Sequence, residues 1–116
     1  MAALPWIKRE LQRGLRLLEI ADQTLRGVQQ RRRQIEEQTV GWLTALTNSL
    51  KVTGSLVDAF QQTLALTEGP LAQELDLMLK ECRMGLPLPD ALRGMTDRIR
   101  SEVFSTIITV IMIGSM

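Results

Sequence analysis

The most constraining feature of this chain lies between Gly69 and Ala91, which reads GPLAQELDLMLKECRMGLPLPDA. Proline's fixed φ suits a first helical position, so Gly69 and Pro70 predict the start of a helix. Apolar residues then recur at helical spacing up to Gly85, which predicts the C-terminal end of that helix. A second helix with a proline in its first turn follows within a few residues. A chain in which helix-start and helix-end signals lie this close together folds as short helices joined by tight connections.

The N-terminal half is predicted to be one or two long amphipathic helices. Apolar residues recur at helical spacing from Pro5 to about Gly27, and again from about residue 34 to residue 52. The pattern is also compatible with one long bent helix. Gly54 predicts the C-terminal end of this region, and Ser55 is a candidate N-cap for the next helix.

Three more helices are expected at about residues 55–66, 88–97 and 101–113, with Ser101 as a candidate cap of the last. No period-2 alternation competes with the helical period, and short connections make neighbouring helices pack roughly antiparallel. We therefore predict an all-α, antiparallel helical bundle of about five to six helices. The expected structural turns are Gly54, Gly69, Pro70 and Gly85.

A weak internal repeat relates residues 55–60 (SLVDAF) to residues 87–92 (PLPDAL) at an offset of 32 residues. Both segments keep a leucine, an aspartate, an alanine and a large apolar residue, and both lie close after a glycine. The repeat predicts one kind of helix start used twice, although generic helix capping explains it equally well.

The composition argues against an enzyme. The chain contains no histidine and no tyrosine, so any catalysis would rest on carboxylates, lysine or serine. Its single cysteine, Cys82, cannot form an internal disulfide and gives no metal-site spacing. We expect no cofactor and no metal, with the acidic residues solvated; those in the central helix and its lead-in are Glu68, Glu74, Asp76 and Glu81.

The sequence offers no signal peptide and no spanning segment. Its longest strongly apolar run, residues 107–113, is far shorter than the roughly 20 residues that cross a bilayer. We expect a water-soluble segment exposed to the cytoplasm.

The densest charge cluster is Arg31, Arg32 and Arg33. Such a run is most often a solvated helix face, but it also suits an anionic membrane surface or an acidic protein partner. Nucleic acid is disfavoured because Glu36 and Glu37 follow at once, no aromatic residue interleaves the arginines, and the net charge is only +1.

Four blocks of the sequence carry a resemblance to a known family. They are RRR with IEEQ (residues 31–33 and 35–38), NSLKVTGSLVDAF (48–60), EGPLAQELDLMLKECRMGLPLPDAL (68–92) and RIRSEVFSTIITVIMIG (98–114). In order and spacing they resemble the type II secretion system F domain, and in particular the TadB-like inner-membrane platform proteins of the Tad (Flp) pilus.

The resemblance implies a non-enzymatic domain on the cytoplasmic side of the bacterial inner membrane. Such a domain would couple a cytoplasmic pilus or secretion ATPase to the other platform subunits, with the membrane reached through flanking segments. On this basis residues 1–30 are expected to be an amphipathic, membrane-proximal helix, and residues 31–116 an F-type bundle cut before its C-terminal helices. The alternative is a free-standing dimeric helical adaptor or regulator with no membrane role.

The last predicted helix is apolar on more than one side, which predicts a homo-oligomer through that helix. The residues expected in this contact are Phe104, Ile107, Ile108 and Ile111.

Overall fold

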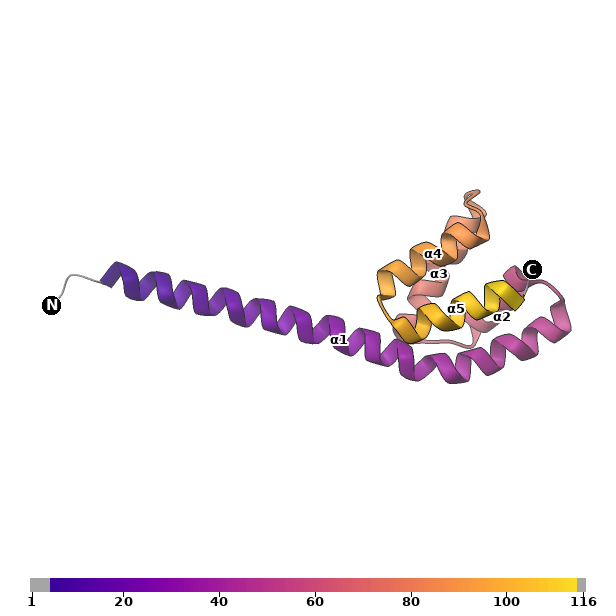
Figure 1. The fold of residues 1–116 in the computed structure, drawn as a ribbon, viewed down its shortest axis with the longest axis horizontal. Coiled ribbons are helices and arrows are strands. Elements are labelled where there is room, and N and C mark those ends of the chain that lie inside the picture. The colour runs from indigo at the N-terminus through magenta and orange to yellow at the C-terminus, as the bar shows by residue number, and fades with distance from the viewer. Residues whose placement is uncertain (1–4, 115–116) are drawn as a thin grey trace. The chain divides into compact units, whose positions relative to one another are not determined.

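A computed structural model describes residues 5–114, which form five α-helices and no β-strand (Figure 1). The helices are α1 (Pro5–Thr53), α2 (Leu56–Ala65), α3 (Gly69–Arg83), α4 (Leu88–Ile99) and α5 (Glu102–Gly114). The all-α fold class and the number of helices are therefore confirmed. No helix in this range is long and apolar enough to cross a membrane.

One expected boundary is wrong. The first helix does not end near Gly27 but continues to Thr53, which confirms the alternative of a single long helix. A glycine inside a helix costs only about 1 kcal/mol relative to alanine, and the neighbouring glutamines and arginines are good helix formers. Gly27 therefore weakens the helix locally without ending it.

The described residues divide into two units, with the boundary between Arg31 and Arg32 on α1. Residues 5–31 are entirely helical. Residues 32–114 contain the rest of α1 and the four shorter helices, in which α3 packs against both α2 and α4, and α4 packs against α5 (Figure 1).

Trp42 lies at the centre of the core of residues 32–114. Its ring stacks on Phe60 of α2, with ring centroids 5.8 Å apart, and also contacts Phe104 of α5 at 6.1 Å. Its indole Nε1 donates a hydrogen bond to the Thr63 hydroxyl at 3.1 Å, which satisfies the buried N–H. This one side chain thereby joins three helices.

The turn at Gly85 has the geometry that its sequence predicts. Gly85 has a φ of +104°, and the backbone N–H of Leu86 donates to the carbonyl of Glu81 at 3.1 Å. A second bond runs from the Gly85 N–H to the Cys82 carbonyl, which completes a Schellman motif. Gly54 and Gly69 also have positive φ angles.

The two helices related by the sequence repeat start in the same way. α2 begins at Leu56 and α4 at Leu88, each has an aspartate in its first turn, and the alanine and large apolar residue that follow are fully buried in both. The caps differ, because the Ser55 hydroxyl accepts a bond from the Asp58 N–H, whereas α4 has no side-chain cap.

Candidate interaction surfaces

The three consecutive arginines do not form one surface. Successive residues of an α-helix point roughly 100° apart, so Arg31 and Arg33 lie on different sides of α1. Both are exposed, whereas Arg32 is partly buried and its guanidinium donates to the carbonyl of Arg100 at 3.4 Å. Arg32 therefore braces the C-terminal end of α4, whereas Arg31 and Arg33 are exposed on the surface of α1.

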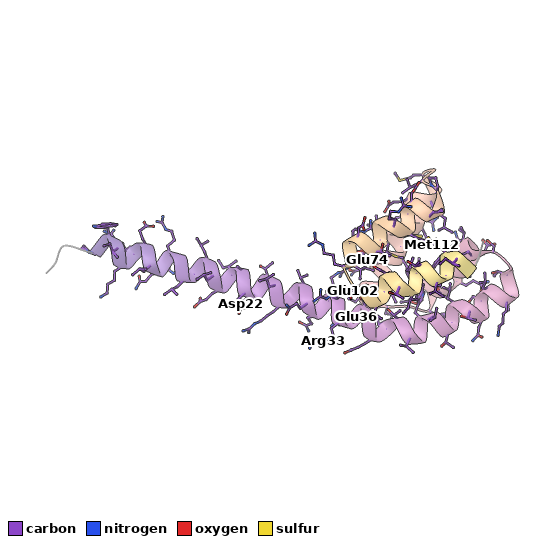
Figure 2. All side chains as sticks on the ribbon, viewed as in Figure 1. Asp22, Arg33, Glu36, Glu74, Glu102 and Met112 are labelled. Atoms are coloured by element: carbon purple, nitrogen blue, oxygen red, sulfur yellow. The ribbon has the colours of Figure 1, made fainter. Side chains whose placement is uncertain are left out.

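The connection between α4 and α5 explains why Arg32 is held there. Arg100 adopts a left-handed conformation with φ +55°, so its carbonyl lies beyond the α4 hydrogen-bond ladder. Ser101 follows as the N-cap of α5, and its hydroxyl accepts a bond from the Phe104 N–H at 3.2 Å. The same hydroxyl donates to a carboxylate oxygen of Glu36 at 3.0 Å. Figure 2 labels Glu36 on α1.

The IEEQ segment also fixes the connection between α2 and α3. The side-chain amide of Gln38 donates to the carbonyl of Glu68 at 2.7 Å, just before the turn at Gly69. Its side-chain oxygen is buried without a hydrogen-bond partner. The residues that follow the arginines therefore hold two interhelical turns in place.

The acidic side chains of α3 are largely neutralised by neighbouring basic residues. Arg98 of α4 contacts Glu74 at 3.0 Å and Glu81 at 3.4 Å, and Lys80 contacts Asp76 at 2.7 Å. Among residues 5–114 no group of three or more histidine, cysteine, aspartate or glutamate side chains is arranged to hold a metal ion.

An open hollow of about 280 Å³ lies between α2, the end of α3 and the start of α4. Its walls are mainly apolar, and Cys82 is one of them. Burial raises the pKa of this thiol above its ordinary value, and the negative charge of Glu81 raises it further. The thiol is therefore a poor nucleophile at neutral pH. The other lining residues are Val57, Gln61, Leu79, Arg83, Leu86 and Leu88.

The structure corrects the expected contact residues of α5. Phe104 and Ile108 are fully buried in the core, so they are not available to a second copy of the chain. Ile111 packs partly against the same core. This side of α5 therefore belongs to the core of its own domain, where α4 packs against α5 and Trp42 of α1 contacts Phe104.

A different strip of α5 remains open. Val103, Val110 and Ile113 are 54–64% exposed, and Ile107 between them is partly exposed. Residues three or four apart lie on one side of a helix, so these four side chains form one strip, which we call the outer α5 strip. Sequence reasoning found the apolar character of α5 but not which side stays open.

The unit formed by residues 5–31 also exposes large apolar side chains. Leu11, Leu15, Leu18, Leu25 and Val28 are each 57–67% exposed. Arginines and glutamines occupy much of the remaining circumference of this helix.

No protein-family model, curated protein sequence or solved structure matches this chain.

Proposed function

We propose that residues 32–114 form a contact domain of a TadB-like inner-membrane platform protein for Tad or type IV pilus assembly or type II-like secretion. The order of its four sequence blocks, which build the helices of one domain, supports the family. The observation that carries a contact function is the outer α5 strip. An apolar strip left open on a small helical domain marks a protein interface.

In this proposal the domain acts by contact and carries out no reaction. The cytoplasmic ATPase supplies the chemical step, and the domain passes its conformational cycle to the other platform subunits. The contacts of Trp42 of α1 with Phe60 of α2 and Phe104 of α5 support such a role, because a packed core transmits a displacement of one helix to the others.

The proposed location is the bacterial inner membrane for the full-length protein, with this domain on the cytoplasmic side. Arg31 and Arg33 are both exposed and suit either anionic headgroups or an acidic partner face. Near an anionic membrane each arginine contributes on the order of 1 kcal/mol. Arg32 is left out of this surface because of its bond to Arg100.

The test is site-specific cross-linking in bacteria that assemble the apparatus. A photoreactive amino acid replaces Val110 in the outer α5 strip, and a control variant carries it at the exposed Gln62 of α2. We expect adducts that contain the assembly ATPase or another platform subunit from position 110 only. Equal adducts from both positions, or none from position 110, would contradict the proposal.

A free-standing helical adaptor is the second candidate, and the exposed leucines of residues 5–31 favour it. The two candidates differ in where the native full-length protein is found. Recovery in the membrane fraction after an alkaline carbonate wash supports the platform protein, whereas recovery in the soluble fraction supports the adaptor.

A further inference from the structure

Some of the exposed apolar residues of the N-terminal unit follow a regular 3-4 spacing, whereas Trp6, Leu15, Leu17 and Ile20 are exposed and lie off it. Starting at Ile7 and ending at Val28, the positions with this spacing are Ile7, Leu11, Gly14, Leu18, Ala21, Leu25 and Val28. Spacing of 3 and 4 in alternation is the seam of a coiled coil, with the leucines at position a and the others at position d. We call these seven residues the N-terminal seam.

The same spacing continues in the part of α1 that belongs to the second unit. There the first position in register is the partly buried Arg32, and the next four are Ile35, Thr39, Trp42 and Leu46, which are the four buried residues of α1. Between residues 35 and 46 the helix therefore uses this register for packing. In the N-terminal seam five of the seven residues in this register are exposed, and Ile7 and Gly14 are partly exposed.

We propose that the N-terminal seam pairs with the same seam of a second copy of this chain, as an antiparallel two-stranded coiled coil. In an antiparallel pair, position a of one helix faces position d of the other. The resulting layers place Leu11 against the partner's Val28, Leu18 against the partner's Ala21 and Leu25 against the partner's Gly14.

The sizes of the seam residues select this orientation. Every leucine at position a meets a smaller residue at position d, so large and small side chains alternate across the contact and fill it evenly. A parallel pair would place Gly14 against the partner's Gly14 and Ala21 against the partner's Ala21. The Gly14 and Ala21 layers would then contain voids, and the layers between them, where two leucines meet, would be crowded.

Charge and contact area agree with the pairing. In the antiparallel register Glu10 lies across from the partner's Arg31, so the flanking charges attract, and no like charges face each other beside the seam. Each buried aliphatic side chain contributes roughly 60–120 Å² of apolar area. Seven aliphatic side chains on or beside the seam then bury on the order of 400–800 Å² per copy, which reaches the roughly 800 Å² typical of a specific interface.

A lipid surface is the main competing occupant, since arginines line the opposite face of this helix. The small residues of the seam, Gly14 and Ala21, favour a second helix over a lipid surface as the occupant. Gly14 and Ala21 add little to insertion into a bilayer, whereas at alternate seam positions they allow two helices to approach closely.

The experiment compares the full-length chain with two variants by sedimentation velocity over a range from low to high micromolar concentration. Leu18→Glu places a charge in the middle of the N-terminal seam, and Gln23→Glu places the same charge on the opposite side of the helix. We expect a concentration-dependent dimer that Leu18→Glu weakens on the order of 100-fold or more, with no such change in the control. In a Trp6→Phe background, the fluorescence of Trp42 checks that the second unit stays folded in both.

Cysteine pairing tests the orientation in a Cys82→Ser background. Gly14→Cys and Leu25→Cys chains are mixed and oxidised, and we expect the mixed disulfide to dominate. A Gly14→Cys chain that cross-links with itself would overturn the antiparallel register. A wild-type chain that remains monomeric at high micromolar concentration would overturn the dimer, and so would a Leu18-dependent interaction seen only with anionic vesicles.

Discussion

The hydrogen bond between Trp42 and Thr63 provides a quantitative test of the core. The Trp42 indole N–H is buried, and the Thr63 hydroxyl is its acceptor at 3.1 Å. Thr63→Val removes the acceptor but keeps the shape, so the N–H loses its partner inside the protein. An unpaired buried donor costs about 1–3 kcal/mol in the free energy of unfolding.

The expected loss of unfolding free energy from Thr63→Val depends on whether Trp42 is present. In a Trp42→Phe background no indole N–H is left unpaired, so Thr63→Val should cost only about 0–1 kcal/mol. Trp42→Phe alone should destabilise the domain by about 1–3 kcal/mol, because it removes the bond and leaves a small cavity. The difference between the two backgrounds gives a coupling energy of about 1–2 kcal/mol.

The assay is urea denaturation of all four proteins at one concentration, followed by circular dichroism. Thr39→Val serves as the matched control, because Thr39 is also buried but donates to the carbonyl of Ile35 within its own helix at 2.6 Å. Its cost should be the same in both backgrounds. A Thr63→Val cost that is also independent of Trp42 would show that the indole bond does not contribute to stability.

Three further predictions concern the turn, the ion pairs and the cysteine. Gly85→Val should destabilise the domain by about 1–2 kcal/mol, because Gly85 has a positive φ that valine rarely adopts. The control Gly41→Ala should stabilise α1 by about 0.5–1 kcal/mol. Equal melting temperatures for the two variants would refute this prediction. Arg98→Met should lower the free energy of unfolding by about 0.5–1 kcal/mol at low salt and by less at high salt, since the guanidinium of Arg98 contacts two carboxylates of α3 but is one-third exposed. The control is Arg93→Met, which removes a more exposed i,i+3 ion pair. The pKa of Cys82 is raised in the folded state, so the folded protein binds the thiol proton more tightly than the unfolded chain does. The stability of the protein should therefore fall as the pH rises above the unfolded pKa of about 8.5. Alkylation near that pH should be slower in the folded protein than in urea, and a Cys82→Ser variant should lack this contribution to the pH dependence.

The elements that the sequence predicts well are those whose causes are local. Gly85 ends α3 because a left-handed residue closes the last turn through bonds to carbonyls only three and five residues away. Ser55 and Ser101 cap their helices through N–H groups three residues ahead. The spacing of apolar residues likewise indicates helices, and so the all-α class, without any knowledge of the neighbours.

Local signals could not identify which apolar side chains enter the core. Leu43 is as apolar as Trp42 and next to it, yet Trp42 is buried and Leu43 is only partly so. Likewise α5 is apolar around most of its circumference, and only its packing against the rest of the domain decides that Phe104 and Ile108 are buried while Val110 is exposed.

The sequence also could not predict that the three arginines of residues 31–33 differ in their contacts. Arg31, Arg32 and Arg33 are alike in composition, but Arg32 is directed to the carbonyl of Arg100, a residue 68 positions away. The sequence by itself determined the fold class and most of the helix ends, although not the continuity of α1 through Gly27, because capping and periodicity act within a few residues. Only the tertiary structure decided which faces are covered and which remain open to a partner, because burial depends on contacts between segments far apart in the chain.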